Sequence, residues 1–228
     1  MNTRIISRGT GGPVIICGMK RWRGDEFDSL AAHVDSLVPG KSFTLAFFEP
    51  DSWNDAFSPW KASCVGQDFN GDGPQTLEWI KDNYIPELES ACPDASGFYI
   101  AGYSLSGLFS LWAMYECSKF KGCASCSGSL WFPGWGDYSS GHAPNIECAG
   151  YLSLGGKEKN SKDPVVSTIE EKTRAEEAKL RKQVREAKLE MNPGGHFSNP
   201  EFRLAKGIAW LANGEKGISL KKDGESLI

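Results

Sequence analysis

The sequence predicts an α/β fold with a mostly parallel sheet and helices on both of its faces. Short runs typical of strands are apolar throughout instead of alternating, as expected for strands that are buried on both sides. Segments of helical length separate these runs, which favours parallel pairing. The 228 residues, 40% of them hydrophobic, suffice for one sizeable core. We therefore predict a single domain over 1–228, with a weakly patterned polar tail from about 215 to 228.

The elements are predicted from local patterns, in chain order. Strands are expected at 14–17, 43–48, 97–101, 122–126, 151–154 and 187–191. Helices are expected at 24–37, 74–89, from Ser104 onward, at 164–183 and from Asn199. Pro74 suits a first helical position, where a missing N–H does no harm. In the last helix, Asn199 is the expected N-cap and Gly214 the expected end. Its inner face is expected to carry Phe202, Ala205, Ile208, Ala209 and Ala212.

The segment FYIAGYSLSGLFSLW (98–112) changes from strand to helix at Gly102. A turn this tight needs small residues two positions before and two positions after its apex, and Gly102 and Ser106 satisfy that need around Ser104. The following helix would direct its free N–H groups toward the same point. The pentapeptide 102–106 thus matches a G-x-S-x-G nucleophile elbow with serine in place of the last glycine. The alternative is a serine in an ordinary strand–helix turn.

A serine hydroxyl needs a base, and the chain has three histidines. His33 lies in the first amphipathic helix, and His142 lies in a turn-rich loop. His196 follows the last predicted strand on a glycine-rich loop at the carboxyl edge of the sheet. We therefore expect His196 to be the base.

The acid that orients the imidazole is expected after the penultimate strand. Glu158 and Asp163 both follow it. Glu158 is nearer the strand end, whereas Asp163 suits the start of the helix at Pro164. Glu158 is favoured, and Asp163 stays the alternative. The order serine, acid, histidine is that of α/β-hydrolases.

The oxyanion hole is expected to use the backbone N–H of Leu105, with a second donor from Gly18 or Met19. Aromatic residues follow two strands at the same edge, where open α/β sheets bind ligands. The candidates for a substrate pocket are Trp53, Trp60, Trp131 and Trp135. Packing within the loops is an equally weighted alternative. The short segment between the strands at 122–126 and 151–154 leaves no room for a large lid.

Several signals are negative. The formal net charge of −4 gives no reason to expect a nucleic-acid partner. No apolar run approaches the ~20 residues that span a bilayer, and no targeting segment is apparent. The odd number of cysteines suits reduced thiols in a cytoplasmic protein. Cys123 and Cys126 would face opposite sides of a strand, so no metal site is expected, and no cofactor.

With these residues identified, the chain resembles compact bacterial α/β-hydrolases related to the esterase D and enterochelin-esterase-like families. The segments that carry the resemblance are GYSLSGLFSLW, CSGSLWFPGW, YLSLGGKEKNSKDPV and NPGGHFSNPEFRLAKGIAWL. The resemblance implies the α/β-hydrolase fold and a cofactor-free carboxylic-ester hydrolase with Ser104 as nucleophile and His196 as base. Glu158 matches the acidic position after the penultimate strand of those families. The sequence departs from them at Ser106, where glycine is commoner.

Three hypotheses follow. The first is a serine esterase that acts on a small-molecule ester through an acyl-enzyme. The second is an acyltransferase that uses the same triad. The third is a non-catalytic binding protein on the same fold. A homo-oligomer is possible, and neither membrane nor nucleic acid is an expected partner.

Overall fold

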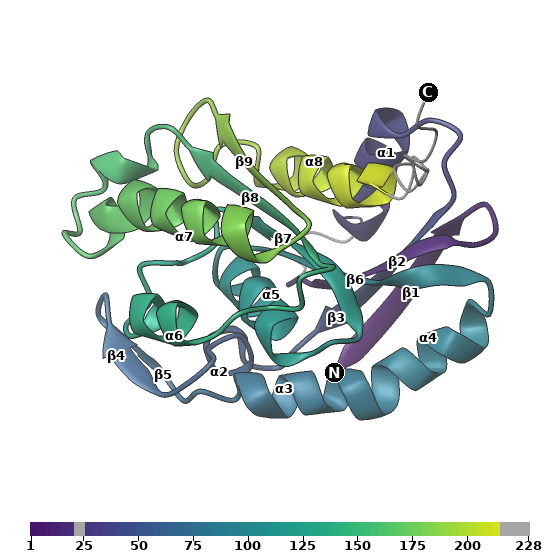
Figure 1. Cartoon of the computed structure of the whole chain (residues 1–228), viewed down its shortest axis with the longest axis horizontal. Helices are drawn as coiled ribbons and strands as arrows, with labels where there is room; N and C mark the ends of the chain where they lie inside the picture. Colours follow the sequence, from purple (N-terminus) through teal and green to yellow (C-terminus); the bar gives the residue numbers. More distant parts are fainter. Residues whose placement is uncertain (21–25, 215–228) are drawn as a thin grey trace, which may run out of the picture.

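The computed structural model describes residues 1–20 and 26–214, which include a seven-stranded sheet in the order β1-β3-β2-β6-β7-β8-β9 (Figure 1). Its strands are β1 (Asn2–Arg8), β2 (Gly12–Gly18), β3 (Phe43–Glu49), β6 (Ala95–Tyr103), β7 (Phe120–Cys126), β8 (Ala149–Gly155) and β9 (Glu186–Asn192). Every neighbouring pair in this sheet except β1 and β3 is parallel, so the predicted strands and their parallel pairing are confirmed.

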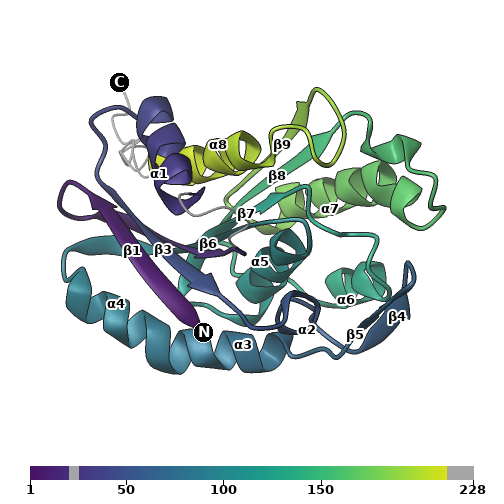
Figure 2. The ribbon, with the colours of Figure 1, turned by 180° about the vertical axis from the view of Figure 1, so that it is seen from behind.

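Helices cover both faces of the sheet, as predicted. They are α1 (Glu26–Leu37), α2 (Trp53–Ala56), α3 (Gly73–Trp79), the π-helix η1 (Ile80–Tyr84), α4 (Ile85–Ala91), α5 (Leu105–Glu116), α6 (Trp135–Gly141), the 3-10 turns η2 (Glu158–Asn160) and η3 (Val166–Thr168), α7 (Ile169–Gln183) and α8 (Pro200–Asn213). Helices α1 and α8 lie together on one face, and α3, α4 and α5 lie on the other (Figures 1 and 2).

Alternate side chains of the central strands divide the core into two layers. Ile15 and Cys17 of β2 pack toward α1 and α8, whereas Ile16 packs toward α5. Cys123 and Cys126 belong to opposite layers, as expected for strand residues three apart. All seven cysteines are free thiols.

Two strand pairings were not predicted. The edge strand β1 runs antiparallel to β3, and its half-exposed residues lack the continuous apolar run by which the other strands were recognised. A small hairpin of β4 (Ala62–Cys64) and β5 (Gln67–Phe69) follows α2. Between β7 and β8 the described chain adds only loops and α6, so no large lid is inserted there.

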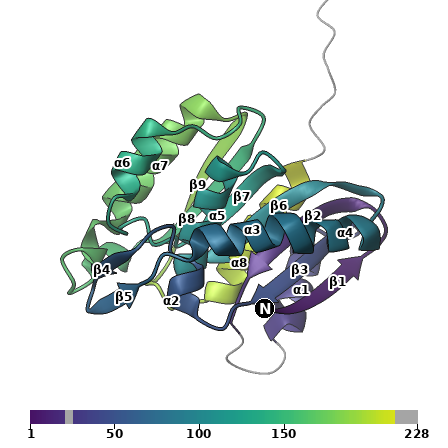
Figure 3. The ribbon, with the colours of Figure 1, turned by 90° about the horizontal axis from the view of Figure 1, so that it is seen from below.

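The helix predicted at 74–89 forms, but it is not a regular α-helix. Figure 3 shows α3 and α4 in line, and η1 joins them as one widened turn. Pro86 is the second residue after this turn. Because proline has no N–H and its ring crowds the preceding turn, a regular α-helix would be disrupted there.

Other helix ends differ in detail from the predictions. Asn199 occupies the N-cap position of α8 with φ 50°, but its side chain makes no capping bond. Phe202 was expected on the inner face, yet it is partly exposed and contacts the His33 ring instead. Gly214 ends α8 as predicted. Positions 24 and 25 of the first predicted helix and the polar tail at 215–228 lie outside the described residues.

Within the described ranges, every helix is too short or too polar to cross a bilayer. In those same ranges, no three histidine, cysteine or acidic side chains gather as a metal site would require.

Candidate active site

Ser104 lies at a sharp bend between β6 and α5. Its φ of 60° and ψ of −125° are unusual for a residue with a side chain, and such strain occurs where surrounding contacts fix the backbone. The Ser104 N–H donates to the carbonyl of Cys126 at 3.0 Å, and its carbonyl accepts from the Ser129 N–H at 3.1 Å. A Cβ added at Gly102 would lie 2.3 Å from the Ser106 carbonyl oxygen, so glycine is required there.

Ser106, where the sequence departs from the usual elbow, is fully buried. Its hydroxyl donates to the carbonyl of Gly18 at 2.8 Å and thereby ties α5 to the end of β2. The next residue, Gly107, also lies close to neighbouring backbone, because a Cβ added there would lie 3.0 Å from the Gly128 Cα. Serine is therefore accommodated at position 106 and gains a bond there.

Three predicted residues lie in one hydrogen-bonded line. His196, on the loop after β9, has its Nε2 3.0 Å from the Ser104 Oγ. Its Nδ1 lies 2.8 Å from Oε2 of Glu158, which begins η2 after β8. An ionised carboxylate can only accept, so Nδ1 carries the proton and Nε2 accepts from the serine hydroxyl. Asp163, the alternative acid, instead accepts from the N–H groups of Val165 and Val166 at the start of η3.

The Glu158 carboxylate is buried and fully bonded. Its Oε1 accepts from the Ser127 hydroxyl at 2.7 Å, the Gly155 N–H at 2.7 Å and the Arg203 Nη2 at 2.9 Å. Burial alone would raise the pKa of Glu158. The hydrogen bonds from His196, Ser127 and Arg203 outweigh that effect and lower the pKa to about 2, so the carboxylate stays ionised.

Arg203 of α8 connects Glu158 to the His196 loop, a role that was not predicted from the sequence. Its side chain is 2% exposed. Besides Glu158, it donates to the Ser127 hydroxyl and, at 3.1 Å, to the Gly195 carbonyl. Its guanidinium carbon lies 5.3 Å from the centre of the Tyr103 ring. The helical spacing of the sequence could have indicated its burial, because position 203 falls on the same helical stripe as the buried residues 204, 207, 208 and 211.

The predicted oxyanion donors differ in availability. The Leu105 N–H belongs to the first turn of α5, where backbone N–H groups have no acceptor within the helix. The Met19 N–H donates to the Phe48 carbonyl at 3.0 Å, so it is already used within the sheet. Gly18 and Met19 both line the cavity at Ser104.

Two cavities meet at Ser104, His196 and Phe197. The first, of about 320 Å³, is mainly apolar; its remaining lining is Gly18, Met19, Lys20, Glu26, Trp53, Tyr103, Pro200, Glu201 and Leu204. The second, of about 380 Å³, mixes polar and apolar groups; its remaining lining is Ser127, Ser129, Trp131, Lys157, Glu158, Asn160, Ser161, Val166, Ile169 and Gly195. Two of the predicted pocket residues, Trp53 and Trp131, therefore line the site, one in each cavity.

Trp60 and Trp135 line neither of these two cavities. The Trp60 Nε1 donates to the Pro133 carbonyl at 2.8 Å. Trp135 is buried, and its Nε1 donates to Glu176 at 3.2 Å. For these two residues the structure favours loop packing, the alternative weighed from the sequence.

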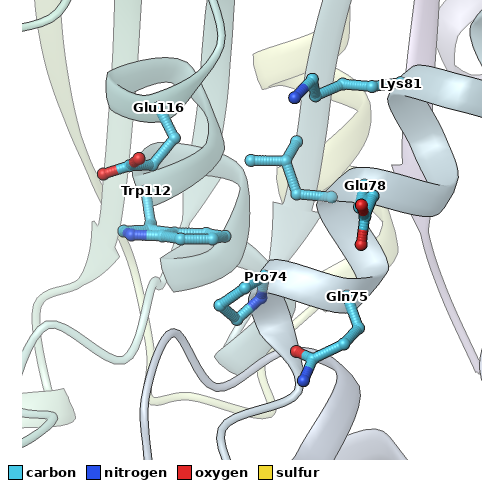
Figure 4. A pocket seen from close by; sticks show the side chains of 7 residues that line it. Pro74, Gln75, Glu78, Lys81, Trp112 and Glu116 are labelled. Atoms are coloured by element: carbon cyan, nitrogen blue, oxygen red, sulfur yellow. The ribbon is translucent and has the colours of Figure 1, made fainter.

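A third cavity, of about 550 Å³, lies away from Ser104 between α3 and α5 (Figure 4). Trp112 and Glu116 line its α5 side, and Pro74, Gln75 and Glu78 line the other. Trp112 lies eight residues beyond Ser104, or about 12 Å along the helix. This cavity is therefore separate from the serine.

Comparison with known proteins identifies the fold. The sequence matches no protein-family model, and no curated protein matches it. An IroE-like serine hydrolase from Shewanella oneidensis superposes with a TM-score of 0.75 at 17% identity, covering 92% of this chain and 75% of that one. The siderophore hydrolase EstA from Aspergillus nidulans gives 0.67 at 16% identity over 90% and 83%. The enterobactin esterase FES from Shigella flexneri gives 0.62 at 14% identity over 92% and 54%. The α/β-hydrolase fold implied by the sequence resemblance is thus confirmed.

Proposed function

We propose that the protein is a serine hydrolase that cleaves a carboxylic ester through an acyl-enzyme. The observation that carries the proposal is the line Ser104–His196–Glu158, which begins at a strained elbow and ends on a buried ionised carboxylate. The neighbours named as siderophore hydrolases and esterases share this fold and support the reaction class.

The reaction begins when the Ser104 Oγ attacks the carbonyl carbon of the ester and its proton passes to the His196 Nε2. Glu158 stabilises the imidazolium that forms and holds the ring in the required tautomer. The Leu105 N–H, at the positive end of α5, donates to the developing oxyanion. Collapse of the tetrahedral intermediate releases the alcohol, which takes the proton from His196.

A water molecule then completes the cycle. His196 takes its proton while the water oxygen attacks the acyl carbon, and collapse of the second intermediate releases the carboxylic acid and restores the Ser104 hydroxyl. An acyltransferase would use an alcohol or amine in place of water at this step. Both cavities at Ser104 are open to solvent and the described chain adds no large lid, which favours water as the acceptor.

Covalent labelling tests the proposal. A fluorophosphonate probe should label the wild-type protein and should not label Ser104→Ala. A panel of p-nitrophenyl esters should then show turnover by the wild type and at least ~10³-fold less by Ser104→Ala. A folded wild-type protein that takes no label would favour the non-catalytic binding protein. Product analysis with added alcohols would separate hydrolysis from acyl transfer.

A further inference from the structure

Phe197 is by far the most exposed large apolar side chain in the described ranges. It is 88% exposed, against 67% for the next, Ile146. Single exposed apolar residues are common and need no explanation by themselves. Phe197 differs because it directly follows His196 and its ring stands perpendicular to the imidazole, with the ring centres 5.1 Å apart.

Hydrogen bonds hold the backbone of the loop that carries Phe197. The exposure of the Phe197 side chain is therefore not caused by a loosely held loop. The Gly194 carbonyl accepts from the Lys157 N–H at 3.0 Å, and the Gly195 carbonyl accepts from the Ser198 N–H at 3.1 Å. The His196 carbonyl accepts from the Tyr103 hydroxyl at 2.6 Å. The backbone on both sides of Phe197 is thus fixed, and this backbone places the side chain beside both cavities at Ser104.

Phe197 forms a wall shared by both cavities at Ser104. The lining of the apolar cavity also includes Met19, Trp53 and Leu204. An apolar group that entered this cavity from Ser104 would pack between these side chains and Phe197. The ring would then lose much of its contact with water, which is favourable.

On the basis of the proposed function, we propose that Phe197 is a specificity-determining residue that packs against the apolar part of the ester. The substrate class is a small ester with an apolar chain or ring next to the scissile bond. The volume of about 320 Å³ is at the lower end for ligand pockets and suits such a group.

Equilibrium binding to Ser104→Ala tests this role separately from hydrolysis. Quenching of tryptophan fluorescence would report binding of p-nitrophenyl acetate and p-nitrophenyl hexanoate. We expect the hexanoate to bind more tightly. Adding Phe197→Ala should weaken hexanoate binding about tenfold and acetate binding by less than about twofold, since roughly half of the burial of a phenyl ring is lost. Phe197→Leu should restore most of the difference.

The matched control is Phe202→Ala, also in the Ser104→Ala background. Phe202 is a partly exposed phenylalanine that contacts His33 and lines neither cavity, so this change should leave both affinities unchanged. An equal loss for both esters on Phe197→Ala would overturn the specificity role, because the ring would then contact the p-nitrophenyl group that both esters share and their ranking would not change.

Unchanged affinities in Phe197→Ala, or no binding of either ester to Ser104→Ala, would overturn it. A shift from dimer to monomer on Phe197→Ala with unchanged affinities would also overturn it, because a second copy would then be what covers the ring. Fluorophosphonate labelling of the wild type reports on the proposed function alone, so its failure is distinguishable from these outcomes.

Discussion

The buried ion pair between Arg203 and Glu158 provides the most demanding test of how this site is held together. Their side chains are 2% and 4% exposed, so solvent can do little to stabilise either charge alone. Arg203→Met would leave Glu158 without its cationic partner on α8 and the Gly195 carbonyl without the 3.1 Å bond from Arg203. Breaking one side of a buried pair destabilises a protein by about 3–5 kcal/mol. We expect a loss in the free energy of unfolding within that range.

Urea unfolding at pH 7, followed by tryptophan fluorescence, measures this loss. The denaturant dependence should stay the same while the midpoint falls, as expected for a change in stability alone. Arg203→Lys keeps the charge but cannot donate to both Glu158 and Gly195 as the guanidinium does, so its loss should be smaller.

Arg4→Met is the matched control. Arg4 donates to both carboxylate oxygens of Asp28, at 2.6 and 2.7 Å, but that pair is exposed. Its loss should be at most about 1 kcal/mol. If Arg203→Met changed the stability no more than Arg4→Met does, the assigned role of burial would be wrong.

Three further predictions concern the same network and the elbow. The pKa of Glu158 is lowered from 4.5 to about 2, so the ionised carboxylate contributes about 3 kcal/mol to the free energy of unfolding above pH 4.5. This contribution should be lost as the pH falls from 4.5 toward 2. Urea midpoints measured across this window would show the loss, and midpoints that do not change with pH would contradict it. Glu158→Gln should reduce kcat at least ~10²-fold, whereas Asp163→Asn, which keeps an acceptor for the turn at η3, should change it less than about twofold; the reverse order would make Asp163 the acid. Gly102→Ala should destabilise the fold by about 1–3 kcal/mol in urea unfolding, since the new methyl group would meet the Ser106 carbonyl, whereas Gly136→Ala, with open space around it, should not.

The strands and the three candidate site residues were predictable because their signals are local. Each buried strand is a continuous apolar run, and the residues after parallel strands meet at one edge of the sheet. Ser104, Glu158 and His196 follow β6, β8 and β9, so their chain positions already implied proximity. The elbow was also marked by a local pattern, namely the glycine at 102 and the small residues at 106 and 107 on either side of Ser104.

The features that were missed depend on tertiary contacts. Arg203 appears in the sequence as one charged residue within an amphipathic helix, and only the approach of Glu158 explains its burial. Trp53 and Trp60 lie seven residues apart in the segment after β3, yet Trp53 lines the site and Trp60 donates to the Pro133 carbonyl. Loop sequences do not specify which of two such rings turns inward. The bond from Ser106 to Gly18 joins residues 88 apart in the chain, beyond the reach of any local pattern.

The contacts of this site divide it into a fixed part and an adaptable part. The Ser106 hydroxyl fixes the end of β2, and Arg203 fixes the loops after β8 and β9, so the reacting groups are positioned before any substrate arrives. In the proposed reaction, such preorganisation lowers the barrier for any ester that reaches Ser104, and it therefore discriminates little between substrates. Selectivity has to come from side chains that contact the rest of the ester, of which Phe197 is the most exposed and Trp53 and Trp131 line one cavity each. Changes in the fixed part should accordingly reduce kcat for all esters alike, whereas changes in the adaptable part should alter their ranking.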